Sequence, residues 1–150
     1  MFIEFIYFNI ESIIITENVI KVEQINRDSP IFLGIGLAEG TRLPNGEYTI
    51  AGYYHIDPGN KAINIGTCSY QHLPPSYLYQ LNNYRDKIQG SKELKLYEIA
   101  DDLCLESLNR YKTLLINKAQ EKDLSLTKFQ LANGIDLANQ SPEAAFSVWG

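Results

Sequence analysis

The order of the expected elements predicts an α+β fold. Strand-like and turn-rich segments fill the first half of the chain, and apolar residues at helical spacing fill the second half. Strands grouped apart from helices are typical of α+β domains rather than of parallel α/β sheets. The length of 150 residues, with 45% hydrophobic and 21% charged residues, fits one soluble domain, residues 1–150, that is long enough to bury a core.

The first 22 residues are rich in Ile and Phe, which predicts strands over residues 1–8 and 12–22. Glu4, Asn9 and Glu11 interrupt the apolar run before it could span a membrane. No basic stretch precedes the run and no small-residue cleavage site follows it, so it does not resemble a signal peptide. We therefore expect a chain that is cytoplasmic as synthesised and that reaches a cell wall only if released.

The segment SPIFLGIGLAEGTR, residues 29–42, has the features of a short buried helix. Ser29 can cap the start of a helix, and Pro30 suits the first helical position. Gly40 suits the position just after the end. These signals predict a nearly all-apolar helix over residues 30–39, which must be buried.

The same segment could instead be a glycine-rich phosphate loop. A dinucleotide-binding loop needs a third glycine where this chain has Glu39, whose negative charge would repel a phosphate. The lysine of a P-loop is also missing. We therefore expect that Gly34 and Gly36 allow another element to pack closely against the helix.

Two turn signals follow this helix, at residues 44–46 and 57–60, which read PNG and DPGN. The residues between them, 47–56, are expected to form a strand, and residues 61–72 a strand or a loop. A regular strand would place three side chains on one face, with Tyr54 on the other: Thr49, Tyr53 and His55.

Apolar residues at helical spacing predict three helices in the second half of the chain: 75–89, 92–119 and 126–139. Gly90 and Ser91 are expected to separate the first two, and Asp123 or Ser125 to cap the third. Residues 141–143, Ser-Pro-Glu, start one more helix. The sequence stops within about two turns of that start, so we expect a fragment or a divergent terminus.

Charge and composition exclude several function classes. The net charge of −5 and the pI near 5.0 argue against nucleic acid as the main partner. Cys68 and Cys104 have no metal-ligand spacing; a disulfide is possible, but two small buried apolar residues are expected. We expect no metal, no cofactor and no membrane partner, and nothing in the sequence indicates an oligomeric state.

Glu39 is a candidate catalytic group, although its position alone favours a structural role over catalysis. Apolar surroundings and the negative end of a helix both raise the pKa of a carboxyl group. A carboxyl that keeps its proton near neutral pH is what a general acid in glycoside cleavage needs. The alternative is that Glu39 forms a structural ion pair with Arg42 at the helix end.

The stretch AEGTR followed by EYTIAGYYH resembles the phage-type lysozymes, in which a helix ends in Glu-Gly-x-Arg and a hairpin follows. The resemblance implies a lysozyme-like fold: a buried catalytic helix, a small β-hairpin and a mostly helical C-terminal part. It implies that Glu39 is the general acid, that Thr49 helps to place water across the cleft, and that His55 is structural. A wider stretch within residues 30–72, including YYHIDPGN and NIGTCSYQH, resembles a bacterial branch of lysozyme-like proteins.

The chain departs from that family at the second carboxylate. Phage-type enzymes carry an Asp in the hairpin, whereas residues 40–48 contain only Glu47. Asp57 in the following turn is therefore the expected second carboxylate, although an Asp before Pro-Gly is also ordinary turn chemistry. Further polar and aromatic side chains are candidates for binding sugar units: Tyr53, Tyr54, His55, Asn60, Asn64, Ser69 and Gln71.

The function expected from the residues and the resemblance is hydrolysis of a β-1,4-linked amino-sugar polymer. Peptidoglycan is the first substrate, which would make the chain a muramidase. Because wall polymers are anionic, a chain of charge −5 would suit a cationic polymer such as chitosan better. Hydrolysis of chitosan or chitin is therefore the alternative within the same class. Two non-enzymatic functions also fit the residues: a non-catalytic glycan-binding module, and a phage or cell-surface structural protein.

Overall fold

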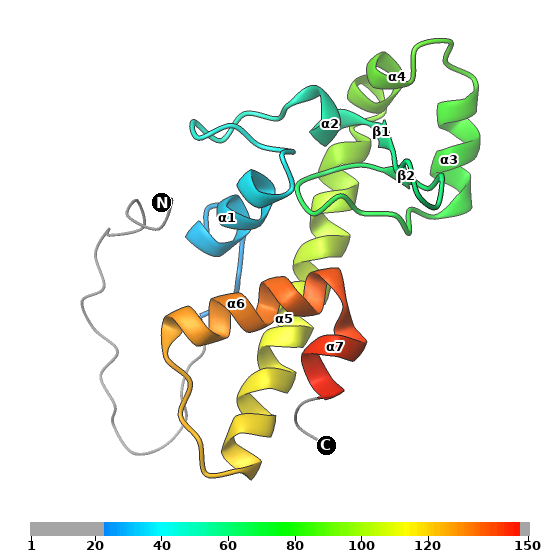
Figure 1. Cartoon of the computed structure of the whole chain (residues 1–150). Coiled ribbons are helices and arrows are strands. Elements are labelled where there is room, and N and C mark those ends of the chain that lie inside the picture. Colours follow the sequence, from blue (N-terminus) through cyan, green and yellow to red (C-terminus); the bar gives the residue numbers. More distant parts are fainter. Residues whose placement is uncertain (1–22, 148–150) are drawn as a thin grey trace.

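The computed structural model describes residues 23–147, and this part of the chain is mostly helical with a small two-stranded antiparallel hairpin (Figure 1). The strands expected over 1–8 and 12–22 lie outside the described residues. In chain order the elements are α1 Pro30–Ala38, α2 Ile50–Tyr53, β1 His55–Ile56, β2 Ile63–Asn64, α3 Pro75–Asn82, α4 Lys87–Glu93, α5 Leu96–Glu121, α6 Lys128–Gln140 and α7 Pro142–Ser147. Among the described residues, no helix is both long and apolar enough to cross a bilayer.

Helix α1 begins and ends where the sequence predicts. Pro30 occupies its first turn, and Gly40 follows its end with a φ of +69°, a conformation that favours glycine. The predicted side-chain cap is wrong, because the Ser29 hydroxyl accepts a hydrogen bond from the Asn26 backbone amide, at 2.8 Å, instead of one from the helix. Only part of the helix is buried, since Leu37 is 43% exposed.

The expected strand over residues 47–56 is wrong for most of its length. The turn before it forms as predicted, with Gly46 at a φ of +85°, but the chain then coils into α2. The Thr49 hydroxyl accepts the Gly52 amide and so caps this short helix. Thr49, Tyr53 and His55 therefore do not share the face of a strand.

The hairpin is short and antiparallel, with His55 opposite Asn64 and Ile56 opposite Ile63. The predicted turn at residues 57–60 connects its two strands. Beyond β2 the chain makes a tight turn over residues 66–69, closed by a bridge between Ile65 and Tyr70. This turn delivers several of the side chains described below.

The predicted helix over 75–89 is divided into two. Asp86 accepts the backbone amides of Ile88 and Gln89 and starts α4 there. Gly90 and Ser91, which were expected to break a helix, lie buried inside α4. Their small size explains the error, because Gly90 packs against the Tyr84 ring and Ser91 donates a hydrogen bond to the Tyr53 carbonyl. The long helix α5 consequently starts at Leu96 instead of residue 92.

The last two helices pack against each other at the C-terminal end of the described chain (Figure 1). Helix α6 starts after Thr127, whose side chain forms a capping box with Gln130, so the predicted caps Asp123 and Ser125 are wrong. The capping-box pattern was present in the sequence. Helix α7 begins at Pro142, as predicted.

Helix α5 contributes to both apolar clusters of the core. One cluster joins α1, α5 and α6, and the other joins β2, α3 and the start of α5. Buried members of the first are Ile25, Phe32, Ile35, Cys68, Cys104, Leu108, Leu115 and Ile135. Those of the second are Ile65, Leu73, Leu81, Leu96 and Ala100.

Cys68 and Cys104 form a disulfide, which corrects the expectation of two separate small apolar residues. Both are buried within the first apolar cluster. The bond ties the 66–69 turn to α5 across a sequence separation of 36 residues. Cross-links of this kind typically stabilise a domain by about 2–4 kcal/mol.

Two glycines of α1 allow a matched test of close packing. A Cβ at Gly36 would lie 2.4 Å from Arg42 Cγ and 2.8 Å from Thr67 Cγ2, whereas a Cβ at Gly34 would meet nothing within 4 Å. We predict that Gly36→Ala destabilises the protein by about 1–3 kcal/mol through overpacking. Gly34→Ala should stabilise it by about 0.5–1 kcal/mol, as alanine does inside a helix. Chemical denaturation measures both, and equal effects would contradict this packing.

Candidate active site

Glu39 lies at the C-terminal cap of α1, where several segments meet. Its backbone amide donates to the Ile35 carbonyl at 2.9 Å, and its side chain is half-buried. Ser69, from the 66–69 turn, is near enough to the Glu39 carboxylate to lower its pKa. The charges of Asp136 on α6 and His55 on β1 also act on it.

Burial raises the pKa of Glu39, and the negative charge of Asp136 raises it further. Ser69 and the charge of His55 oppose this shift, but the net pKa is above the ordinary value. The direction agrees with the sequence prediction. The alternative, an ion pair between Glu39 and Arg42, is wrong because Arg42 pairs with Asp101.

Asp101 of α5 is the centre of a buried polar network next to this site. Its carboxylate accepts the Arg42 guanidinium at 2.9 Å, the Thr67 backbone amide at 2.6 Å and the Thr67 hydroxyl at 2.9 Å. The Tyr48 hydroxyl donates a fourth hydrogen bond to it. Sequence reasoning missed Asp101, although it stands at helical spacing from Cys104 and should therefore have been expected on the buried face.

Further hydrogen bonds fix the backbone on either side of Gly40. The Thr41 hydroxyl donates to the Thr67 carbonyl at 2.5 Å, and the Thr49 hydroxyl donates to the Gly40 carbonyl at 2.7 Å. Thr49 is thus bonded to the residue that follows Glu39, and its expected role in placing water stays a prediction. Its hydroxyl is engaged by two backbone groups, because it also accepts the Gly52 amide.

Asp57 does not have the features of a second catalytic carboxylate. Its Oδ1 atom accepts the backbone amides of Gly59, at 2.6 Å, and Asn60, at 3.1 Å. This is the Asx-turn arrangement, in which the carboxylate holds the turn. The structure thus supports the turn role for Asp57.

Three of the polar residues expected to bind sugar form a chain of hydrogen bonds next to the hairpin. The Asn60 amide donates to Gln71 at 3.2 Å, and the Gln71 amide donates to the buried Asn64 at 2.9 Å. The His55 Nδ1 atom lies 2.9 Å from the Ala51 carbonyl. Of the expected binding residues, Ser69 and His55 are the two that act on Glu39.

The two tyrosines expected to stack on sugar rings pack inside the protein instead. The Tyr53 ring contacts Tyr48 and Tyr97, with centroid distances of 5.4 and 5.2 Å, and Lys92 lies over it. Tyr54 packs against the second apolar cluster. Both side chains retain some exposure, but their contacts support the core around α5.

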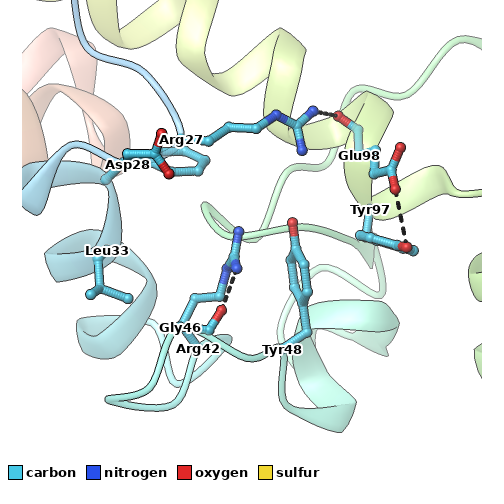
Figure 2. Close-up of a pocket in the computed structure, with 9 residues that line it drawn as sticks. Arg27, Asp28, Leu33, Arg42, Gly46, Tyr48, Tyr97 and Glu98 are labelled. Carbon is cyan, nitrogen blue, oxygen red and sulfur yellow. Dashed lines mark hydrogen bonds between the residues drawn. The ribbon is translucent and has the colours of Figure 1, made fainter.

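A separate cavity of about 470 Å³ opens between the start of α1, the 44–46 turn and the start of α5. Figure 2 shows Arg27 on one side of it, with Arg42 and Tyr48 facing from the other. Glu39 is absent from its lining. Because Arg27 is paired with Asp102 and Arg42 with Asp101, the cavity offers no unpaired guanidinium for an anionic ligand.

Proton transfer is the chemistry that the Glu39 site offers. Among residues 23–147, His, Cys, Asp and Glu side chains do not gather in groups of three or more that could hold a metal ion. The groups around Glu39 are a hydroxyl, an imidazole and a second carboxylate, from Ser69, His55 and Asp136. Asp136 was not predicted, because nothing in the sequence indicates which side of α6 faces α1.

Comparisons with protein-family models, with curated proteins and with solved structures return no match to this chain. The fold is therefore characterised as mostly helical with a small antiparallel hairpin. The lysozyme-like assignment stays a hypothesis that rests on the residues of the site.

Adjacent aspartates allow a test of the buried network. Asp101 is fully buried against Arg42, whose side chain is 13% exposed, whereas Asp102 is 71% exposed in its pair with Arg27. We predict that Asp101→Asn destabilises the protein by about 3–5 kcal/mol, because it leaves a buried guanidinium without its counter-charge. Asp102→Asn should cost about 0–1 kcal/mol. Similar midpoints for both variants in urea would show that the network is not needed for stability.

Because the pKa of Glu39 is raised, we predict that Glu39→Gln stabilises the protein, and that this stabilisation depends on pH. Below the ordinary value of 4.5, wild type and Glu39→Gln both carry a neutral group and should be about equally stable. As the pH rises through the higher folded-state pKa, only the wild type must hold a charge in a half-buried position, so it loses stability. Thermal melts from pH 4 to pH 8 should therefore show a growing advantage for Glu39→Gln. The exposed Glu47→Gln variant is the control and should show no such trend.

Proposed function

We propose that this protein is a glycoside hydrolase that cleaves a β-1,4-linked amino-sugar polymer. Glu39 is the general acid, and it delivers its proton to the oxygen of the leaving sugar as the glycosidic bond breaks. Peptidoglycan is the first substrate to test.

The observation that carries the proposal is the environment of Glu39. It ends an apolar helix, is half-buried, and has its carboxyl pKa raised by burial and by Asp136. A general acid must hold its proton at the working pH and must also stand where a substrate can reach it. The raised pKa of Glu39 supports the first requirement, and the partial exposure of its side chain supports the second.

The disulfide gives independent support for action outside the reducing cytosol. Cys68 and Cys104 are joined in the core, and structural disulfides persist mainly in secreted, periplasmic or surface proteins. A polymer of the cell wall is a substrate found in such places. The disulfide also anchors the 66–69 turn that carries Ser69 against Glu39.

Overall charge is the reason to test other polymers beside peptidoglycan. A net charge of −5 opposes long-range attraction to anionic wall polymers, and it favours a cationic polymer such as chitosan. Chitosan and chitin oligomers are therefore the second and third substrates. All three share the β-1,4-linked amino sugars on which Glu39 would act.

A glycan-binding protein without turnover is the second candidate. This candidate is favoured because both other proposed catalytic side chains already have backbone partners. The Asp57 carboxylate accepts the turn amides, and the Thr49 hydroxyl is bonded to the Gly40 carbonyl and the Gly52 amide. A module of this kind would retain insoluble glycan and release no reducing ends.

Turnover of purified cell walls, chitosan and chitin oligomers tests the proposed activity. We predict that Glu39→Gln lowers turnover by about 10²–10⁴-fold, because the amide has nearly the same shape but no transferable acid proton. Reducing-end release measures this, and circular dichroism checks that the variant keeps its fold.

Asp57→Asn is the matched control for that experiment. Asn can accept the same two turn amides, so its turnover should stay within a factor of a few of wild type. Equal collapse of both variants would return Asp57 to the mechanism. Binding of insoluble glycan by wild type with no release of reducing ends would favour the binding protein over the enzyme.

A further inference from the structure

The cavity at the start of α1 has the size and the lining of a ligand pocket. Its volume of about 470 Å³ lies within the range of roughly 300–1,000 Å³ that is usual for ligand pockets. Such pockets combine apolar side chains with a few fixed polar groups. Glu39 stands at the other end of α1 and does not line this cavity, so the two sites are separate.

Part of the cavity lining is apolar and aromatic. Phe32 and Leu33 of α1 line it, and so do Tyr48 and Tyr97. The two tyrosine rings meet edge to face, with their centroids 4.8 Å apart. A tyrosine combines an apolar ring with a polar hydroxyl, so it suits a ligand that presents both C–H and hydroxyl groups.

Arg27 brings hydrogen-bond donors to the cavity. A guanidinium carries five N–H donors in a rigid fork. The Nη2 atom of Arg27 donates to the Glu98 carbonyl at 2.8 Å and to the Asp102 carboxylate at 2.6 Å, whereas Nε and Nη1 donate to no group within residues 23–147. Arg27 runs along one side of the cavity (Figure 2), so it lines that side with donors that the described chain leaves unused.

Two carboxylates bring acceptors to the same cavity. The Oε1 atom of Glu98 accepts the Tyr97 hydroxyl at 3.2 Å, and its Oε2 atom accepts no hydrogen bond from the described part of the chain. The side chain of Asp28 is exposed and accepts none from residues 23–147 either. Donors and acceptors without protein partners therefore lie around one cavity.

The charges that line the cavity nearly cancel. Three of its four charged residues form ion pairs: Arg27 with Asp102, Arg42 with Asp101, and Glu98 with Lys95. Among the described residues Asp28 has no such partner, and its exposure to water and salt weakens its field. The lining therefore gives little attraction for a strongly charged ligand of either sign.

The wall that faces Arg27 is held in place by the buried network. The Arg42 guanidinium lies 3.6 Å from the centroid of the Tyr48 ring, and both side chains donate to Asp101. Arg42 also donates to the Gly46 carbonyl at 2.6 Å, which fixes the turn beside it. A pocket with ordered walls loses less conformational entropy when it binds a ligand.

We propose that this cavity binds an uncharged sugar unit and is a second glycan site, apart from Glu39. A sugar hydroxyl is both a donor and an acceptor, so neighbouring hydroxyls can use guanidinium N–H groups and carboxylate oxygens together. Hydrogen bonds to such charged groups are stronger than those between neutral groups. The choice of an N-acetylated amino sugar as the unit rests on the proposed function, whereas binding in the cavity does not depend on turnover.

An NMR titration of the full chain with the N-acetylglucosamine tetramer tests the site directly. The chain carries Glu39→Gln, so that the tetramer is not cleaved during the measurement. The backbone amides of Leu33, Gly46 and Tyr97 should shift as the tetramer is added, because they belong to the cavity lining. No shift at these amides would overturn the proposal.

Arg27→Leu, added to the same chain, removes the unused donors. It should weaken binding at the cavity by about 10-fold or more, since a lost hydrogen bond to a charged group has an effect of that size. The fold should persist, because the ion pair of Arg27 with Asp102 is at the surface. Arg110→Leu is the matched control: Arg110 is exposed on α5 outside the cavity lining, so binding should not change. Equal binding by both variants would contradict the role of Arg27.

The glucosamine tetramer, whose units carry ionisable amines, tests the charge of the ligand. Tighter binding of the N-acetylated tetramer at the cavity amides would support an uncharged unit. Tighter binding of the glucosamine tetramer would overturn it and would indicate a site for a cation.

The second site and the proposed hydrolase fail in different ways. Shifts at the cavity amides, in a protein whose wild type releases no reducing ends from the three polymers, would overturn the hydrolase and leave the sugar site standing. Turnover by the wild type without shifts at the cavity would overturn the second site and leave the hydrolase standing.

Discussion

The rest of the structure depends on the buried Asp101 carboxylate. Four hydrogen bonds converge on it, from the Arg42 guanidinium, the Tyr48 hydroxyl and both the amide and hydroxyl of Thr67. Removing a carboxylate from water is costly, so a buried one is stable only where donors surround it closely. These donors come from segments that are far from Asp101 in sequence. Satisfying Asp101 therefore fixes how the 40–48 segment and the 66–69 turn sit on α5.

This requirement also sets the position of Glu39. Arg42 must pass α1 closely to reach Asp101, and Gly36 leaves room for its aliphatic part and for Thr67. The hydrogen bonds of Thr41 and Thr49 then hold the chain on both sides of Gly40. Glu39 therefore lies beside a segment that these hydrogen bonds fix in place. Ser69, which acts on Glu39, belongs to the same turn as Thr67. The hydrogen bonds around Asp101 thus fix the position of Glu39, a carboxyl group whose charged form is disfavoured by burial.

Helix α5 connects this network to both halves of the core. Its first turns carry Leu96 and Ala100 into one apolar cluster, and its later turns carry Leu108 and Leu115 into the other. Cys104 lies between them and is bonded to Cys68 in the turn. The C-terminal helix α6 packs on α5 and brings Asp136 towards Glu39.

The sequence by itself determined the features that depend on local backbone chemistry. Helix α1 starts at Pro30 because proline has a fixed φ that suits the first helical turn, and it ends before Gly40 because a glycine readily adopts the left-handed conformation. The turns at 44–46 and 57–60 are likewise indicated by their Pro, Gly, Asn and Asp residues. The position of Glu39 at the helix end could be predicted for that reason.

Tertiary structure alone decided the features that depend on distant partners. Helix α2 forms in place of the expected strand because Gly52 can pack against the Thr41 carbonyl. Helix α4 continues through Gly90 because this glycine packs against the Tyr84 ring. Likewise, the amides of Gly59 and Asn60 hold Asp57 in its turn, although the sequence favoured Asp57 as the second carboxylate. The physical reason is that burial, counter-charge and close contact are properties of segments brought together by folding. Neither residue type nor spacing along the chain contains them.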